Sequence, residues 1–332
     1  MGEFDLIARY FTRPARRAAL GVGDDCALLQ PRPGHQLAIS SDMLVAGCHF
    51  FPDVDPRALG HKSLAVNLSD LAACGAQPLA FTLALALPEV NEPWLAAFAD
   101  GLLALADAHG CELVGGDTTA GPLNICITVF GEVPAPGGRS QALLRSGAHA
   151  GDDIYVSGTL GDARLALDAL LGKADLPADV LAQARQRLEQ PTPRVTLGLA
   201  LRGIASAAID VSDGLLGDLG HILECSGIGA TVNVDSASSL IAASACSTGA
   251  RGQFSINLSE VQRRLLTLCG GDDYELLFTA PTAMRSAVAA AAQTAHTPVT
   301  RIGQIDAAPG LRLMDHQGQA VPNTYASFDH FA

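Results

Sequence analysis

The sequence predicts a protein of two domains that combines α/β and α+β architecture, with a first domain over residues 1–148 and a second over residues 149–332. Three observations support this prediction. The 332 residues are enough for two domains of ordinary size. Short apolar strands alternate with helical segments in both halves, and acidic residues stand at the ends of several strands. The first strong break is the proline- and glycine-rich stretch at 134–138, which places the domain boundary just after it, near residue 148.

In the first half, start and stop signals separate the elements. Gly75 and Pro78 end a long apolar helix, and Asn91, followed by Glu92 and Pro93, opens the next one. We expect the strand at 37–39 to end in an acidic turn at 40–42, and the strand at 113–119 to end in an acid with hydroxyls beside it. The predicted helices cover residues 3–12, 58–74 and 91–108, and the predicted strands cover residues 37–39, 79–87, 113–119 and 123–133.

The second half repeats the pattern of short apolar strands followed by acidic turns. Strands are expected at 153–157, 207–211 and 274–279, with helices from residue 163, between 176 and 193, and up to about residue 225. The repetition has no fixed period, so it is not an array of sequence repeats. It favours two α/β units that face one cleft.

Composition excludes several classes of protein. Lys and Arg number 21 against 34 Asp and Glu, and the net charge of -13 argues against a surface for nucleic acid or anionic membrane. The eight cysteines are scattered without CxxC or Cys/His spacing, which indicates reduced core thiols rather than disulfides or zinc. The first residues are acidic where a signal peptide would be basic, and no apolar run approaches a bilayer span. We therefore expect a cytoplasmic protein with no membrane partner.

The helix at 58–74 carries an unusual polar stripe. It consists mostly of Leu, Ala and Val, yet Ser63, Asn67, Asp70 and Cys74 follow one another at steps of four, three and four and share one face. An apolar helix is buried, and a buried carboxylate needs a cation or several donors. The strand before this helix delivers Asp42 near the same region. The alternative is that Asp42 caps a turn and Asp70 pairs with an arginine.

Six acids stand where surface location is a poor explanation, at glycine-rich turns, strand ends or the apolar helix face. Oxygen ligands without Cys or His spacing point to magnesium, manganese or calcium rather than zinc. The sequence has no GxxxxGK[ST] loop, no protein-kinase glycine loop with its lysine and no GxSxG elbow. If the protein transfers phosphate, metal ions must replace the usual lysine. The six acids are Asp25, Asp42, Asp70, Asp117, Asp210 and Asp213.

A set of motifs stands in fixed order along the chain. The chain contains GEFDLIARYF, GVGDDCALL, SSDMLVAGCHF, KSLAVNLSDLAACGA, GGDTT, RSGAHAGDDIYVSGTLGD, IDVSDGLLGDLGHI, GGDDYELLFT and FDHF. A single GDD or GGD would occur by chance. The ordered set covers nearly the whole chain, and it resembles the thiamine-monophosphate kinase family of the aminoimidazole ribonucleotide synthetase-like superfamily.

The resemblance implies two PurM-like domains. The N-terminal domain would have a mixed sheet, bind metal and ATP, and form a homodimer through its sheet, while the C-terminal α+β domain would complete the ATP and substrate sites. It implies ATP-dependent phosphorylation of thiamine monophosphate by direct in-line transfer, assisted by several Mg²⁺ ions, with no catalytic general base. The implied metal ligands are Asp25, Ser40, Ser41, Asp42, Asp70, Asp117, Asp210 and Asp213. The implied ATP contacts are Gly116, Asp117, Arg145 and Ser212, and the implied substrate contacts are His49, Asp272 and Phe328.

Three positions depart from the family pattern, and two alternative functions remain open. Family members often carry Thr at Ser41, Glu at Asp272, and Trp or Tyr at Phe328. Asp272 is one methylene shorter than Glu, and Phe328 can stack but donates no hydrogen bond. The alternatives are another ATP-dependent enzyme of the superfamily, such as an aminoimidazole ribonucleotide synthetase or a selenophosphate synthetase, and a non-catalytic nucleotide- or metal-binding homologue.

Overall fold

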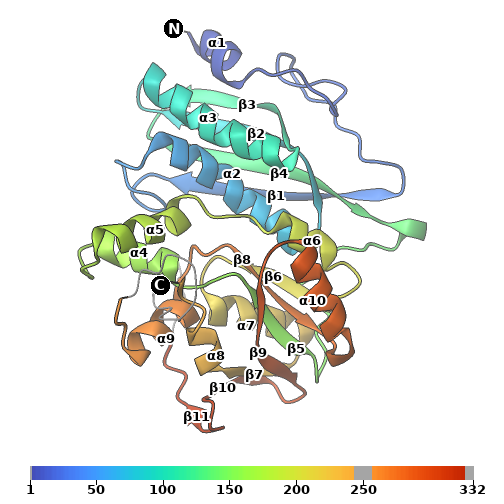
Figure 1. Cartoon of the computed structure of the whole chain (residues 1–332). Coiled ribbons are helices and arrows are strands. Elements are labelled where there is room, and N and C mark those ends of the chain that lie inside the picture. The colour runs from blue at the N-terminus through green and yellow to red at the C-terminus, as the bar shows by residue number, and fades with distance from the viewer. Residues whose placement is uncertain (1, 243–255, 326–332) are drawn as a thin grey trace. The chain divides into compact units, whose positions relative to one another are not determined.

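The computed structural model describes residues 2–242 and 256–325 and divides the chain into two compact units (Figure 1). The N-terminal unit comprises residues up to 71 together with 76–142. The C-terminal unit comprises the short segment 72–75 and the chain from residue 143 onward. The two-unit architecture expected from the sequence is therefore present.

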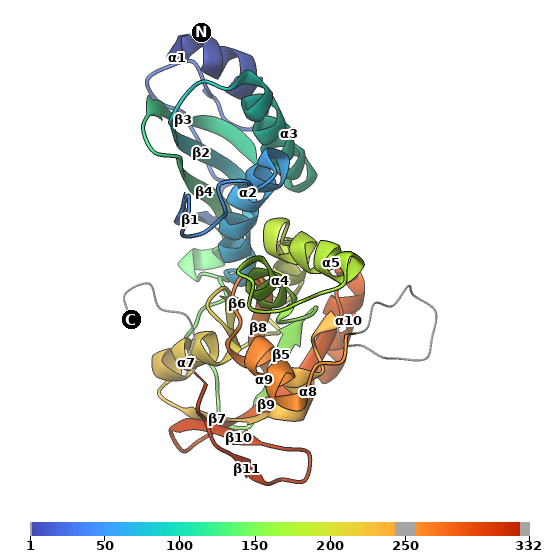
Figure 2. The ribbon, with the colours of Figure 1, turned by 90° about the vertical axis from the view of Figure 1, so that its left-hand side faces the viewer.

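The N-terminal unit is built on a mixed four-stranded sheet with the order β1-β4-β2-β3. Only the β2–β3 pair is parallel, while β1–β4 and β2–β4 are antiparallel. Helices α2 and α3 lie on the same face of this sheet in both ribbon views (Figures 1 and 2). The element bounds are β1 His35–Val45, α2 Pro56–Ala73, β2 Gln77–Leu87, α3 Glu92–His109, β3 Glu112–Ala120, β4 Asn124–Pro134 and the 3₁₀ turn η2 Pro136–Gly138.

Strand β1 is much longer than the predicted 37–39, whereas β3 exceeds the predicted 113–119 by one residue at each end. β1 continues to Val45, so Ser40, Ser41 and Asp42 lie inside a strand, and the acidic turn expected at these positions is wrong. Asp42 pairs with Ile127 of β4, and the ladder continues for three more residues. Asp117 likewise lies within β3, which ends at Ala120. An edge strand can carry polar residues at alternating positions, so these residues were mistaken for the end of the strand.

The opposite face of this sheet is covered only in part. Ala18, Ala27 and Leu29 of the N-terminal segment pack near Ala80 and Val114. Further along the face, edge strand β1 exposes every second side chain.

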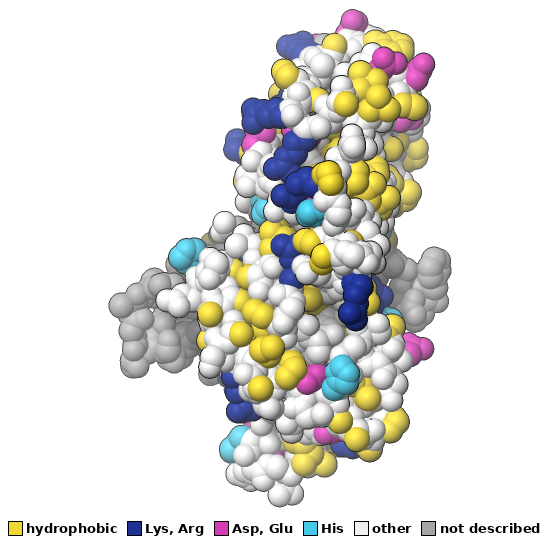
Figure 3. All heavy atoms as spheres, turned by 90° about the vertical axis from the view of Figure 1, so that its right-hand side faces the viewer, with side chains coloured by type: hydrophobic (Ala, Val, Ile, Leu, Met, Phe, Trp, Pro, Cys, Tyr) yellow, Lys and Arg dark blue, Asp and Glu magenta, His cyan; other side chains and the backbone are white. Residues whose placement is uncertain are grey.

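The N-terminal segment begins with α1 (Glu3–Leu6), which continues as a π-helix, η1 (Ile7–Phe11), so the helix expected at 3–12 is present in two parts. The arginine-rich segment that follows it is tied to the unit by acids: Arg13 pairs with Asp107 at 2.8 Å, and the Glu112 carboxylate accepts the backbone N–H groups of Arg16 and Arg17. On the face of this unit shown in Figure 3, Lys and Arg side chains follow a narrow column rather than forming a broad basic field.

The C-terminal unit contains a seven-stranded sheet with the order β11-β10-β7-β9-β5-β8-β6, in which only β10–β7 is parallel. A core of Leu, Ile, Val and Ala side chains packs between this sheet and its helices. The strands are β5 Asp153–Ser157, β6 Ala207–Val211, β7 Gly229–Asn233, β8 Glu275–Ala280, β9 Val299–Asp306, β10 Gly310–Met314 and β11 Ala320–Val321. The helices are α4 Asp162–Leu170, α5 Ala178–Glu189, α6 Val195–Ala200, α7 Leu215–Ser226, α8 Val234–Ser238, α9 Glu260–Cys269, η4 Thr282–Met284 and α10 Arg285–Thr294.

The seven cysteines of the described residues are free thiols, as predicted, but not all of them are core residues. Cys111 and Cys269 are buried, whereas Cys26, Cys48 and Cys225 are exposed. Burial raises the pKa of the Cys111 thiol above its ordinary value. Within residues 2–242 and 256–325, no helix has the length and apolar character needed to cross a membrane.

Helices α2 and α3 touch through two glycines. A Cβ atom on Gly60 would overlap the backbone carbonyl oxygen of Phe98, and one on Gly101 would overlap that of Arg57. Both positions have helical neighbours, so alanine would otherwise be the better helix former. The two backbones approach so closely because neither helix has a side chain at the crossing.

We expect Gly60→Ala or Gly101→Ala to lower the free energy of unfolding by about 2–3 kcal/mol, since the overlap is with backbone that cannot rotate away. Urea unfolding followed by circular dichroism measures this change. Gly220→Ala in α7 is the control, because nothing lies within 4 Å of the added methyl group. It is expected to be neutral or stabilising by up to about 1 kcal/mol. If Gly220→Ala destabilised the protein as much as Gly60→Ala or Gly101→Ala, the result would contradict the close crossing of α2 and α3.

Candidate functional site

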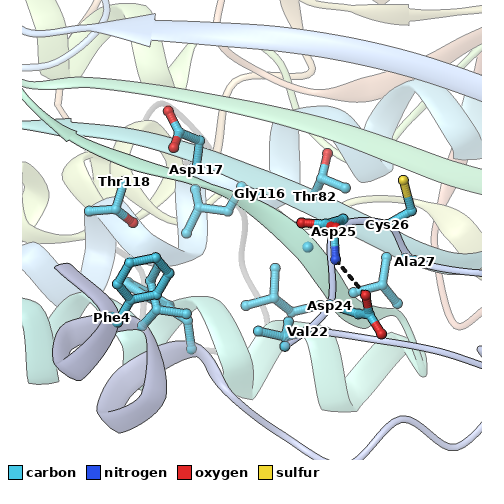
Figure 4. Close-up of a pocket in the computed structure, with 17 residues that line it drawn as sticks. Phe4, Val22, Asp24, Asp25, Cys26, Ala27, Thr82, Gly116, Asp117 and Thr118 are labelled. Atoms are coloured by element: carbon cyan, nitrogen blue, oxygen red, sulfur yellow. Dashed lines mark hydrogen bonds between the residues drawn. The ribbon is translucent and has the colours of Figure 1, made fainter.

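A pocket of about 560 Å³ lies in the N-terminal unit between the N-terminal helix, the loop at 22–27 and strands β2 and β3 (Figure 4). Asp24, Asp25 and Cys26 lie at one end with Thr82, and Asp117 and Thr118 lie at the other. Phe4, Ile7 and Phe11 supply an apolar wall. The backbone N–H of Asp25 donates to Asp24 Oδ1 at 2.9 Å. The pocket thus brings together three predicted site residues, Asp25, Gly116 and Asp117.

Gly116 is required by the geometry of the pocket. Its φ of +148° is disfavoured for residues with a side chain, and a Cβ atom would overlap the Leu83 carbonyl oxygen. Gly115 differs, since its Cβ would meet only Thr82 Cγ2 at 3.8 Å. The second glycine of the Gly-Gly-Asp motif therefore allows β3 to approach β2 at the pocket.

A second group of predicted residues meets between β1 and α2. Ser40 Oγ donates to Asp70 Oδ2 at 2.5 Å, and the backbone N–H of Asp42 donates to Asn67 Oδ1 at 3.1 Å. Asn67 and Ser63 are buried, and their side chains donate to carbonyl oxygens one turn earlier in α2. The polar stripe predicted on this helix therefore faces the strand that carries Ser40 and Asp42. Asp42 does not cap a turn, because it lies inside β1.

The sheet separates these two groups. Asp42, Ile127, Leu83 and Gly116 lie in one row across the four strands, so Asp42 and Gly116 are three strands, about 14 Å, apart. Asp117 is one residue further and points to the opposite face from Asp42. Ser41 also points away from α2, and its hydroxyl lies 2.9 Å from Thr128 Oγ1.

His49 follows β1 in a turn that fixes its ring. The backbone N–H of Val45 donates to His49 Nδ1 at 3.0 Å. Because Nδ1 acts as the acceptor, a neutral ring carries its proton on Nε2. His49 can therefore donate a hydrogen bond through Nε2 without being charged.

In the C-terminal unit, the loop after β6 and the loop before β8 lie side by side. The backbone N–H of Asp272 donates to the Ser212 carbonyl oxygen at 2.8 Å, and the N–H of Tyr274 donates to that of Val211 at 2.8 Å. Asp210 is buried within β6, and Asp213 lies in the turn that precedes α7. The structure thus brings Ser212 and Asp213 next to Asp272, although 60 residues separate Ser212 from Asp272 in the sequence.

Asp218 organises the turn at 212–214 and was not predicted. Its Oδ2 accepts the backbone N–H groups of Asp213 and Gly214 at 3.2 and 3.1 Å. Burial raises the pKa of the Asp218 carboxyl to about 7, and the charge of Asp213 acts in the same direction. The spacing of five residues between Asp213 and Asp218 at a helix start was the available signal, since acids favour the first turn of a helix.

The backbone of Arg145 lies at the opposite end of α7 from Ser212. Its carbonyl oxygen accepts a hydrogen bond from the Ser226 hydroxyl at the C-terminal end of α7. Ser212 precedes the N-terminal end of the same twelve-residue helix, about 18 Å away.

Phe328 lies outside the described residues. Within the described residues, the structure contains no group of three or more His, Cys, Asp or Glu side chains arranged to hold a metal ion. Asp24 and Thr82 were not predicted, although the paired acids of GDD pointed to Asp24.

Comparison with known proteins defines the class. Residues 23–133 match the family model described as the AIR synthase related protein, N-terminal domain, and residues 149–316 match its C-terminal domain. The protein therefore belongs to the class of AIR synthase related proteins, with a mixed-sheet first domain and a second domain that carries adjacent acidic loops.

The relatives narrow the class to one family. The chain is 48% identical to the thiamine-monophosphate kinase of Salmonella typhimurium over 337 aligned residues, covering 100% of this chain and 98% of the relative. The crystal structure of thiamine-monophosphate kinase from Stenotrophomonas maltophilia K279a superposes with a TM-score of 0.79 at 46% identity, covering 96% of each chain. AaThiL complexed with AMPPCP and TMP gives a TM-score of 0.73 at 26% identity, covering 91% of this chain and 89% of the other. The chain belongs to the thiamine-monophosphate kinase family, and it is an enzyme of the kinase class.

Proposed function

We propose that this enzyme transfers the γ-phosphoryl group of ATP to thiamine monophosphate, giving thiamine diphosphate and ADP. The observation that carries the proposal is the 48% identity to a thiamine-monophosphate kinase over the whole chain. The complex of AaThiL with AMPPCP and TMP supports the same pair of ligands. The free thiols are compatible with a reducing compartment, and we place the reaction in the cytoplasm.

We propose that several Mg²⁺ ions bind to the acids and hydroxyls named from the sequence. The donor set fits this ion, because carboxylate and hydroxyl oxygens without sulfur ligands suit hard cations. These oxygen donors lie in three separate places, which favours more than one ion. The places are the pocket with Asp25 and Asp117, the group of Ser40, Asp42 and Asp70, and the segment from Asp210 to Asp213. Ser41 completes the proposed ligands.

The proposed reaction needs no general base from the protein. The acceptor is a phosphate oxygen whose second pKa lies near 6, so it is largely deprotonated at neutral pH. The obstacle is the approach of two polyanions, since two unit charges 4 Å apart repel by about 4 kcal/mol at an effective dielectric of 20. Bound magnesium would screen this charge and align the phosphates for in-line attack. Ser40 donates to the carboxylate of Asp70, and Asn67 accepts the backbone N–H of Asp42, so the chain contributes positioning.

We propose that the nucleotide phosphates approach the pocket at Gly116 and Asp117, with Arg145 and Ser212 as further contacts. For the other substrate we propose His49, Asp272 and Phe328. The Nε2 proton of His49 suits a phosphate oxygen. Asp272 offers a carboxylate acceptor beside Ser212.

We also propose a homodimer that forms through the N-terminal sheet. β1 is an edge strand, and on the side away from α2 it exposes Leu37, Ile39 and Met43, with Ile39 60% exposed. Alternating apolar side chains exposed on an edge strand mark a contact surface. Size-exclusion chromatography with light scattering tests this assembly.

The reaction is tested by incubating the purified protein with ATP and Mg²⁺ and adding thiamine monophosphate or free thiamine. We expect thiamine diphosphate from the monophosphate alone, with one ADP per product, and no labelled protein when γ-labelled ATP is supplied without acceptor. ADP release without diphosphate would point to a different acceptor. A trapped phosphoenzyme would overturn direct transfer.

The metal ligands are tested by Asp42→Asn and Asp70→Asn. Both variants are expected to lose turnover while the metal-free protein stays folded, because removing one acid from a like-charged group relieves repulsion. Mg²⁺ should raise the unfolding midpoint of the original protein more than that of either variant. Asp107→Asn, which removes an exposed acid paired with Arg13, is the control and should retain activity. Variants that keep most activity would exclude these acids as ligands.

The location of the nucleotide is tested by the reactivity of Cys26, an exposed thiol that lines the pocket. At an AMPPCP concentration of about ten times its Kd with Mg²⁺ present, maleimide labelling of Cys26 is expected to slow roughly tenfold. Peptide mass spectrometry follows each thiol separately. Cys225, also exposed, is the internal control and should keep its rate. Unchanged labelling of Cys26 would place the nucleotide outside this pocket.

A further inference from the structure

The segment between α9 and β8 holds two residues with a side chain in the left-handed conformation. Asp272 has a φ of 66° and Tyr274 a φ of 51°, and Asp273 lies between them. Each such residue costs about 1 kcal/mol. Backbone strain of this kind persists only where the surroundings impose it, and it is common at functional sites.

One side of this segment is fixed by backbone hydrogen bonds to the loop after β6. The N–H groups of Asp272 and Tyr274 donate to the carbonyl oxygens of Ser212 and Val211, both at 2.8 Å. These bonds place Asp272 beside Ser212. They leave the residue between them pointing the other way, into the unit.

The other side is fixed by the buried side chain of Asp273, which is 1% exposed. Its two carboxyl oxygens lie 2.9 and 3.1 Å from the backbone nitrogen of Gly161, which precedes α4. Burial raises the pKa of the Asp273 carboxyl well above its usual range, while Gly161 N–H and Arg187 oppose this shift. A carboxyl group in this environment serves chiefly as a hydrogen-bond partner rather than as a charge.

A buried ion-pair cluster around Glu275, at the start of β8, also holds this segment. Glu275, fully buried, accepts Arg194 Nε at 2.6 Å, Arg187 Nη2 at 2.8 Å and the Ser157 hydroxyl at 2.5 Å. Arg187 Nη2 also donates to the backbone carbonyl oxygen of Asp273 at 3.3 Å. The start of β8 is therefore clamped to α5, α6 and β5, and Asp273 is the link between this clamp and the strained residues.

We propose that Asp273 is a positioning residue: its carboxyl group, held at Gly161, keeps Asp272 and Tyr274 in the left-handed conformation and so presents the Asp272 side chain beside Ser212. This inference rests on the proposed function, in which Asp272 contacts thiamine monophosphate. Without the link, the segment relaxes toward ordinary extended backbone and the Asp272 carboxylate moves. The consequence is a loss of affinity for thiamine monophosphate rather than for ATP.

Asp273→Ala is expected to raise the KM for thiamine monophosphate by about tenfold or more with a much smaller change in the KM for ATP, as for displaced binding groups. Asp273→Asn keeps an acceptor for Gly161 N–H and should restore the KM to near that of the original protein. Asp273→Ser, too short to reach Gly161, is the second variant if the alanine protein does not fold, and should behave as Asp273→Ala does.

Asp153→Ala separates positioning from general loss of stability. Asp153 is equally buried, is held by Arg285 and Arg301, and lies opposite the far end of β8, about 20 Å along the strand. It should lower the unfolding midpoint without changing the ratio of the two KM values. An Asp273→Ala or Asp273→Ser protein with the same profile as Asp153→Ala would overturn the inference, as would failure of Asp273→Asn to rescue. Absence of thiamine diphosphate with the original protein would instead overturn the proposed function.

Discussion

The cost of holding carboxylates inside apolar secondary structure governs both units of this protein. A carboxylate taken out of water costs several kcal/mol unless donors or cations meet it. Glu275 meets two arginines and a serine, Asp218 meets the N–H groups of a turn, and Asp70 meets the hydroxyl of Ser40. The contacts of Glu275 and Asp70 join segments that are distant in sequence, and Asp218 holds the turn just before its own position in α7. The donors that offset the desolvation of these carboxylates therefore also hold the loops and the strand that carry the candidate site.

The sequence predicted the two-unit architecture and most elements, because those depend on local signals. Asn91 caps α3 through its side chain, as its position before Glu92 and Pro93 indicated. The apolar helix with a polar face is α2. The prediction failed at residues 40–42, where polar residues indicated a strand end, and β3 likewise continues past Asp117 to Ala120. Pairing with β4 and β2 extends these strands past the acids, and pairing is a tertiary property that one strand does not display.

The residues of the candidate site that belong to sequence motifs were predictable, whereas the buried residues that support them were not. Asp25, Gly116 and Asp117 do meet in one pocket, and Ser40, Asp42 and Asp70 meet at one strand–helix contact. Asp273 and Glu275 could not be assigned roles from the sequence, since their partners Gly161 and Ser157 are more than 100 residues away. Asp273 is the same residue type as its neighbour Asp272, but its side chain is directed into the unit. That direction follows from backbone angles that the sequence GGDDYEL does not reveal.

The glycine contact between α2 and α3 acts as an axial stop. Successive residues of a helix advance by 1.5 Å and turn by 100°, so a slip of one residue along α2 would swing Asp70 away from Ser40 altogether. Gly60 lies ten residues before Asp70, about 15 Å along the same rigid helix. Because the two backbones touch there, any sliding must first separate the helices. The direction in which the Asp70 carboxylate points therefore depends on Gly60 and Gly101, two residues without side chains that fix the position of α2 along its axis.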